Sequence, residues 1–306
     1  MTRLRGRRLN ERERNAWERR FSSRPLTSSA KVRFTTISAA RSFGSISLAN
    51  AFIAFFSARS VTRSGRRQTF RPPSGCAQTE ARFSDFAIAD YGGDFRTFAV
   101  VEPDLPDNRL NEGRVGPDGA FWVGTMQNNL HPDGSPKAMS RSSGAIYRVD
   151  HDGYVSQLTP REFGITNTMA WTTDGRFLTA DTKLNEIYAY DLCAGVLSNK
   201  RVFGPPLDRG APDGSCLDVK GRLWNCRVAG GACIACIRPD GALDQFVDTP
   251  CTWPTSCAFG GPDFATLYVT SARFTMTAEQ IGAHPEEGAL FALEVGVRGR
   301  AEHRFK

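Results

Sequence analysis

The sequence predicts an all-β chain folded as a β-propeller. Four segments share an apolar strand followed by a turn, and they repeat in steps of 41, 47 and 56 residues when aligned on Ile146, Ile187, Ile234 and Leu290. Short strands with regular turns, repeated at this spacing, are typical of propeller blades. A β-sandwich is the alternative, but sandwiches do not usually repeat in this way.

A second set of turns lies between these strands. Each member is a short turn sequence that ends in glycine and precedes another predicted strand, which is typical turn chemistry. The turns are Pro117-Asp118-Gly119, Thr173-Asp174-Gly175 and Val219-Lys220-Gly221. Past residue 82, we expect one short helix, at residues 277–283. Four tryptophans are expected to pack between blades, with Trp253 as an alternative lining of a substrate mouth: Trp122, Trp171, Trp224 and Trp253.

The N-terminal region has a different character from the rest of the chain. Residues 1–82 carry eighteen Lys or Arg against four acidic residues, whereas residues 83–306 carry twenty-one against twenty-eight. The basic balance of the whole chain therefore belongs to the first region. We predict that residues 1–82 are poorly ordered or an aberrant reading frame, with a solvated basic arm as the second alternative and nucleic-acid binding ranked last.

The cysteines and the hydropathy of the chain predict the cellular compartment of the protein. No run of eighteen apolar residues is present, so no membrane span is predicted. The eight cysteines are scattered and no secretory signal precedes them, which predicts free thiols in a reducing, cytoplasmic compartment. Cys233 and Cys236 form an isolated CxxC, and we interpret them as two thiols in one sheet rather than a zinc site.

Polar residues gather in the stretch from Asn108 to Met126. Arg109, Asn111 and Glu112 place a cation, an amide and a carboxylate within four positions, just before a turn and an aromatic-rich strand. Structural segments rarely need this combination at the mouth of a strand. A solvated loop is the alternative explanation.

Similar polar positions recur at the start of later repeats. Asn167 precedes an apolar strand at 168–171, Asp213 does so at 214–217, and the hydroxyls of Thr255 and Ser256 repeat the arrangement. The inner strands of a propeller converge on a central channel, so these residues are expected to share one site. Taken singly, each would more often be a turn or cap residue.

Five blocks in order resemble the gluconolactonase and regucalcin (senescence marker protein) family of sugar lactone hydrolases. They are NRLNEGRVGPDGAFWVGTM, ITNTMAWTTDGRF, APDGSCLDVKGRLW, TSCAFGGPDFATLYVTSAR and EEGALFAL, which together cover about residues 105–300. The resemblance implies a six-bladed β-propeller that hydrolyses a sugar lactone with one divalent metal ion. We assign the lactonase-like propeller domain to residues 83–306, where four blades are visible, and expect the first one to two blades to be degenerate or disordered.

The resemblance also implies roles for particular residues. Asn167 and Asp213 resemble the metal ligands, and Asp213 is the candidate general base. Arg109, Asn111 and Asn129 resemble substrate-binding residues. Asparagine and aspartate oxygens are hard ligands suited to Ca²⁺, Mg²⁺ or Mn²⁺, with Zn²⁺ also open. None of the four histidines is nominated as catalytic.

The chain departs from the family at one position. A third ligand, a glutamate in a Gly-Glu-Gly-Pro-like motif of the first blade, has no counterpart in residues 1–82. A metal held by Asn167 and Asp213 alone would bind weakly, so impaired activity is expected. The alternative function is a non-catalytic propeller that binds a metabolite, calcium or a protein partner. A third hypothesis is attachment of the basic region to nucleic acid or a membrane surface.

Overall fold

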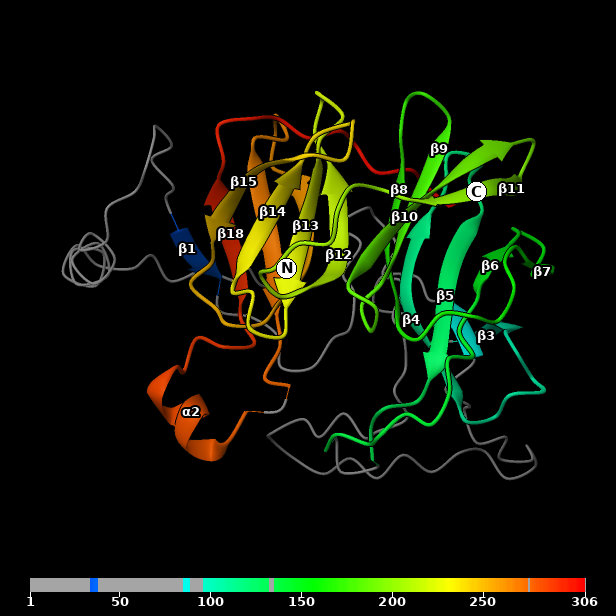
Figure 1. Ribbon diagram of the computed structural model, residues 1–306, viewed down its shortest axis with the longest axis horizontal. Helices are drawn as coiled ribbons and strands as arrows, with labels where there is room; N and C mark the ends of the chain where they lie inside the picture. Colours follow the sequence, from blue (N-terminus) through cyan, green and yellow to red (C-terminus); the bar gives the residue numbers. More distant parts are fainter. Residues whose placement is uncertain (1–33, 38–84, 89–95, 132–134, 275, 306) are drawn as a thin grey trace, which may run out of the picture. The chain divides into compact units, whose positions relative to one another are not determined.

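The computed structural model describes residues 34–37, 85–88, 96–131, 135–274 and 276–305. These residues form four four-stranded antiparallel sheets and one two-stranded sheet (Figure 1). The predicted all-β propeller fold is confirmed. Within the described residues there are four blades rather than six, because most of the chain that would precede them lies in the undescribed part of residues 1–95.

Three of the sheets are meanders in which consecutive strands pair. The first contains β4 (Asn108–Val115), β5 (Phe121–Gln127), β6 (Ile146–Val149) and β7 (Val155–Gln157). The second contains β8 (Thr166–Trp171), β9 (Arg176–Asp181), β10 (Glu186–Cys193) and β11 (Val196–Val202). The third contains β12 (Ala211–Leu217), β13 (Leu223–Val228), β14 (Cys233–Ile237) and β15 (Leu243–Asp248).

The fourth sheet takes one strand from far away in the sequence. It pairs β16 (Pro254–Gly260), β17 (Thr266–Ser271) and β18 (Leu290–Glu294) with β1 (Phe34–Ile37). A smaller sheet pairs β2 (Asp85–Ile88) with β3 (Arg96–Val100). Strand β1 therefore lies within the region predicted to be poorly ordered or aberrant. The rest of residues 1–82 lies outside the described residues, and the boundary at residue 82 stays a prediction.

The predicted turns have the backbone that their glycines allow. Gly119, Gly175 and Gly221 have φ values of 80°, 84° and 75°, a region that side chains other than glycine rarely adopt. Each turn reverses the chain between the first and second strand of a blade. The turn glycines thus fix where each inner strand ends.

The predicted helix is also present, as α2 (Ala278–Ala283) in the connection between β17 and β18 (Figure 1). Thr277 caps its first turn and exchanges hydrogen bonds with Gln280, which forms a capping box. Among the described residues, none of the helices has the length and apolar character that a membrane crossing needs.

Aromatic side chains fill the space between neighbouring sheets. The ring of Trp122 on β5 lies 5.0 Å from that of Phe177 on β9 and 5.5 Å from that of Trp171 on β8. Trp224 on β13 packs edge-on against Phe259 on β16 at 6.0 Å. The prediction that these tryptophans pack between blades is therefore confirmed for Trp122, Trp171 and Trp224.

The Trp122→Ala variant tests this packing. Trp122 is 1 % exposed, so removing its ring leaves a cavity between two sheets, and we expect a loss of about 3–5 kcal/mol in the free energy of unfolding. Urea unfolding measures it. Val196→Ala at an exposed position is the control and should change stability by less than about 0.5 kcal/mol. Equal effects of the two substitutions would contradict this account.

Candidate functional site

The first strands of successive blades lie next to one another and are tied by side chains. Asn111 Nδ2 on β4 donates to the carbonyl of Thr166 on β8 at 2.7 Å. Thr168 Oγ1 on β8 donates to the carbonyl of Asp213 on β12 at 2.6 Å. Between β12 and β16 the approach is so close that a Cβ on Gly214 would meet Ser256 Oγ at 2.4 Å. The predicted polar residues of β4, β8 and β12 are therefore brought together.

Each of these four strands carries one extra residue relative to its neighbour, as in a β-bulge. The shifts fall within residues 110–113 of β4, 167–169 of β8, 212–215 of β12 and 254–256 of β16. Bulges break the alternation of side chains and are common next to functional sites because they re-aim side chains. Thr168 has a φ of 54°, which for a β-branched residue costs on the order of 1–3 kcal/mol. Equivalent bulges thus mark the site in all four blades.

Arg109 holds the other predicted substrate-binding residues. Its Nη1 donates to Asn111 Oδ1 at 2.8 Å, and its Nη2 donates to Asn129 Oδ1 at 3.1 Å. Its Nε is buried and finds no partner among the described residues. Burial lowers the pKa of Arg109 to about 10, and Asp213 partly offsets this, so the side chain stays a cation at neutral pH. The Arg109 guanidinium therefore orients the amides of Asn111 and Asn129, and its Nε–H remains available as a donor.

Asn167 is fixed with its amide oxygen unused. The residue is buried, and its Nδ2 donates to Thr182 Oγ1 at 2.7 Å. Thr182 Oγ1 in turn donates to the carbonyl of Pro212, next to Asp213. Asn167 Oδ1 accepts no hydrogen bond from any described residue. Because the Thr182 hydroxyl accepts from the amide nitrogen of Asn167, the amide oxygen is the end that is left available to a ligand.

Asp213 carries a carboxyl whose charge is poorly compensated. Burial raises its pKa well above the usual value, and the nearby Glu112 raises it further. A hydrogen bond from the Gly214 backbone and the charge of Arg109 lower it, but less strongly. A half-buried carboxyl with so little support favours a partner of positive charge.

Glu112 is the residue that sequence reasoning left without a role. It is 4 % exposed and accepts no hydrogen bond from any described residue. Burial raises its pKa to about 7, against the lowering effect of Arg114. The sequence signal that could have identified Glu112 is its position beside Arg109 and Asn111. Strict strand alternation would put Asn111 and Glu112 on opposite faces, and only the bulge in β4 changes that.

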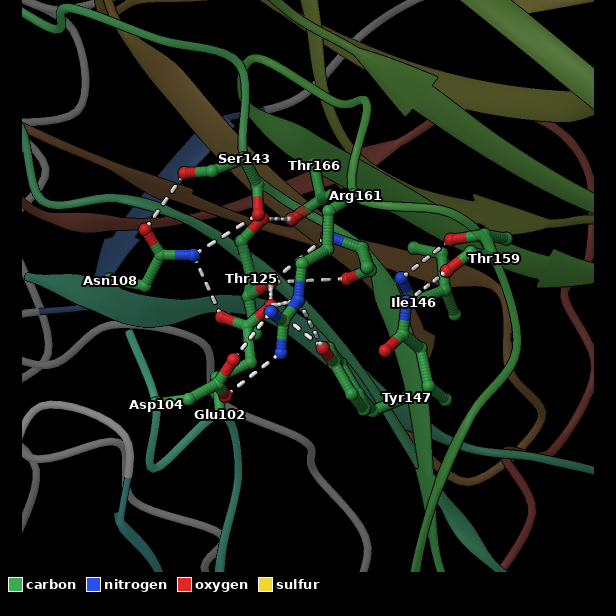
Figure 2. Close-up of polar contacts among 12 residues, drawn as sticks. Glu102, Asp104, Asn108, Thr125, Ser143, Ile146, Tyr147, Thr159, Arg161 and Thr166 are labelled. Atoms are coloured by element: carbon green, nitrogen blue, oxygen red, sulfur yellow. Dashed lines mark hydrogen bonds and ion pairs between the residues drawn. The ribbon is translucent and has the colours of Figure 1, made fainter. Parts of the chain in front are cut away.

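One other buried carboxylate is, by contrast, fully hydrogen-bonded. Glu102, which is 2 % exposed, accepts hydrogen bonds from Asn108 Nδ2 at 2.8 Å, Thr125 Oγ1 at 3.0 Å and Tyr147 OH at 2.8 Å (Figure 2). Arg161 Nε lies 3.6 Å from the same carboxylate. Buried polar groups are normally hydrogen-bonded, so Glu112 contrasts with Glu102, as does Glu287, whose buried Oε2 has no hydrogen-bond partner among the described residues. The Glu102 network instead holds Asn108, the residue before Arg109.

The donor atoms fit a divalent cation bound by few protein ligands. The free amide oxygen of Asn167 and the carboxylate of Asp213 are the hard ligands that Ca²⁺, Mg²⁺ and Mn²⁺ prefer. Among the described residues, no group of three or more His, Cys, Asp or Glu side chains is placed to hold a metal ion. Two protein ligands leave the remaining positions to water and substrate, so such a cation is held weakly.

Comparison with known proteins gives the family of the chain. Residues 63–273 match the family described as SMP-30/Gluconolactonase/LRE-like region. Regucalcin from Xenopus laevis is 33% identical over 217 residues, 68% of this chain and 70% of that protein. Regucalcin from Homo sapiens is 32% identical over 212 residues, 68% of this chain and 69% of that protein. The chain belongs to the SMP-30/gluconolactonase/LRE-like family, as the resemblance implied.

Two solved structures are also similar to this chain. The calcium-binding protein regucalcin from Agrobacterium tumefaciens matches with a TM-score of 0.66 and 32% identity, over 74% of this chain and 75% of that one. A luciferin-regenerating enzyme matches with a TM-score of 0.62 and 28% identity, over 73% of this chain and 75% of that one. The family match begins at residue 63, within the region predicted to lie outside the propeller.

Replacing Glu112 tests whether its negative charge lacks a compensating partner in the folded protein. The folded-state pKa is raised from 4.5 to about 7, so the folded protein keeps a proton that the unfolded chain releases between these values. The contribution of this proton to the free energy of unfolding is therefore complete below about pH 4.5 and is lost as the pH rises towards 7. We expect Glu112→Gln to match the unaltered protein near pH 4 and to exceed it at pH 8, by up to about 3 kcal/mol. Urea unfolding at both pH values measures this.

Glu102→Gln is the matched control for that measurement. Its amide nitrogen would face the donating Nδ2 of Asn108, so we expect lower stability at both pH values. The interpretation of Glu112 is wrong if both substitutions destabilise the protein at pH 8.

Proposed function

We propose that this chain is a divalent-metal-dependent hydrolase of sugar lactones. The observation that carries the proposal is a pair of poorly compensated carboxyls, the buried Glu112 and the half-buried Asp213, beside a set of fixed polar side chains. Family membership supports the same reaction class, because the family description includes gluconolactonase. Perturbed pKa values in such a cluster are typical of catalytic sites.

Asp213 is proposed as the general base. A carboxyl with a raised pKa takes up a proton more readily than an ordinary one, which suits removal of a proton from the attacking water near neutral pH. Water adds to the lactone carbonyl carbon while Asp213 takes its proton, the bond from that carbon to the ring oxygen breaks, and the proton passes to the released ring oxygen, which becomes a hydroxyl. Asp213 and Asn167 would also hold the metal ion, which when bound polarises the carbonyl and makes water more acidic.

Arg109, Asn111 and Asn129 are proposed to orient the substrate. The guanidinium already fixes both amides, and its buried Nε is a donor without a partner among the described residues. Substrate oxygens can accept from Nε and from the amide nitrogens, which suits a sugar lactone with several hydroxyls. The geometry favours a small polyhydroxylated substrate over an apolar ester.

Activity is expected to be impaired relative to the family, since the described residues supply only two metal ligands. The seven described cysteines are free thiols, which supports a reducing, cytoplasmic compartment as part of the same proposal. Carbohydrate metabolism is the corresponding physiological setting.

Hydrolysis of glucono-, galactono- and xylono-lactone, followed by pH-stat titration of the acid product, tests the reaction. We expect a chelator to abolish turnover and Mn²⁺, Ca²⁺, Mg²⁺ or Zn²⁺ at high concentration to restore it. Asp213→Asn should lower kcat by about 10²–10⁴-fold because it removes the base. Asp240→Asn, in an exposed turn, is the control and should leave kcat unchanged. Full activity in Asp213→Asn would exclude the proposed role.

Arg109→Lys tests substrate orientation. Lysine cannot reproduce the planar fork that contacts Asn111 and Asn129, so we expect kcat/KM to fall by about 10–100-fold while the fold is retained. Arg201→Lys, whose side chain is exposed, serves as the matched control. An unchanged kcat/KM in Arg109→Lys would remove Arg109 from the substrate site.

A non-catalytic calcium-binding propeller is the second candidate function. The similar protein from Agrobacterium tumefaciens is described as calcium-binding, which favours this function. Stoichiometric Ca²⁺ binding by calorimetry, without turnover of any of the three lactones, would support this function over the hydrolase.

A further inference from the structure

Three cysteines gather where the third and fourth blades meet. Cys216 on β12, Cys226 on β13 and Cys257 on β16 are all buried. The sulfur atoms of Cys216 and Cys257 are 3.6 Å apart, and Cys257 Sγ also lies 3.2 Å from the carbonyl of Trp224. These thiols take no part in the proposed lactone chemistry.

The backbones beside this pair are unusually close. Gly214 and Ser256 lie near Cys216 and Cys257 on the same two strands, and a Cβ on Gly214 would meet the Cα of Ser256 at 2.9 Å. A glycine is required for that approach. A disulfide needs the two sulfurs at about 2.05 Å, so Cys216 and Cys257 must close by about 1.5 Å, which side-chain rotation and small strand shifts can supply.

The surroundings favour one of the sulfurs as the nucleophile. Thiol hydrogen bonds from Cys216 and Cys226 hold the pKa of Cys257 well below its usual value, and Arg114 acts in the same direction. Burial instead raises the pKa of Cys216. A sulfur in contact with a second thiol is an arrangement from which a reversible disulfide can form.

We propose that Cys216 and Cys257 are an oxidation site that closes into a disulfide between the inner strands of two blades when a hydroperoxide reaches them. The Cys257 sulfur attacks the peroxide, the O–O bond breaks, and a sulfenic acid forms with release of water or an alcohol. The Cys216 sulfur then attacks this sulfur, the S–O bond breaks, and a water molecule leaves. Two thiols are oxidised by two electrons, and the hydroperoxide is reduced.

A second pair of buried thiols in the same protein provides the comparison. Cys233 and Cys236 both lie on β14, three residues apart, so they point to opposite faces of the sheet. Cys236 Sγ is 3.9 Å from Asp244 Oδ2, and Cys233 lies opposite Asp248. They match Cys216 and Cys257 in burial but cannot pair with each other.

The experiment uses the full chain carrying Cys193→Ser, which removes the thiol that is exposed in the described part of the chain. The reduced protein is treated with hydrogen peroxide, denatured, and titrated for free thiols, and the unreduced peptides are mapped by mass spectrometry. We expect two thiols to be lost per chain, a Cys216–Cys257 peptide, and full recovery with dithiothreitol. Cys216→Ser and Cys257→Ser should abolish the linkage, whereas Cys233→Ser and Cys236→Ser should leave it intact.

Thermal unfolding provides an independent measurement. The disulfide would close a loop between residues 41 apart, so the oxidised protein should unfold at a higher temperature than the reduced one, by several degrees. Cys216→Ser should show no such shift. The proposal is overturned by a linkage of Cys226 to Cys257, by sulfinic or sulfonic acid on Cys257 without a linkage, or by the absence of reaction in a correctly folded protein.

Discussion

The site depends on hydrogen bonds that join the first strands of neighbouring blades. Asn111 reaches from β4 to the backbone of β8, and Thr168 reaches from β8 to the backbone of Asp213 on β12. Thr168 adopts a backbone conformation that costs energy, and two further contacts, to Ser215 and Asn225, help to hold it there. Without these cross-blade bonds, the polar residues of separate repeats would have no fixed relation to one another.

Electrostatic compensation divides the buried carboxylates into two groups. Glu102 and Asp218 each receive several donors; Asp218 accepts from Trp224 Nε1 at 3.0 Å and from Arg222 Nε at 2.7 Å. Such groups stabilise local structure and leave nothing for a ligand. Glu112 and Asp213 are left without equivalent partners among the described residues. Two poorly compensated carboxyls therefore lie where the inner strands meet.

Much of the fold followed from the sequence, because repeats, turn glycines and apolar strands are local signals. The sequence also pointed to Arg109, Asn111, Asn167 and Asp213, since each begins a repeat. It could not reveal the bulges, which depend on pairing between strands, or the role of Glu112, which depends on a bulge. The pairing of β1 with β18 joins residues more than two hundred positions apart, and no local pattern predicts it.

The reason that Glu112 stays uncompensated lies at the far end of the chain. Arg114, two residues later on β4, is the nearest cation able to neutralise it, but Arg114 Nη1 donates to Glu302 at 3.0 Å. The guanidinium is thus shared, and Glu302 itself raises the pKa of Glu112. A carboxyl whose natural counter-ion is bound elsewhere gains most from an added cation. Glu302, in the segment after β18, therefore acts on Glu112, and Glu112 in turn raises the pKa of Asp213, one of the two proposed metal ligands.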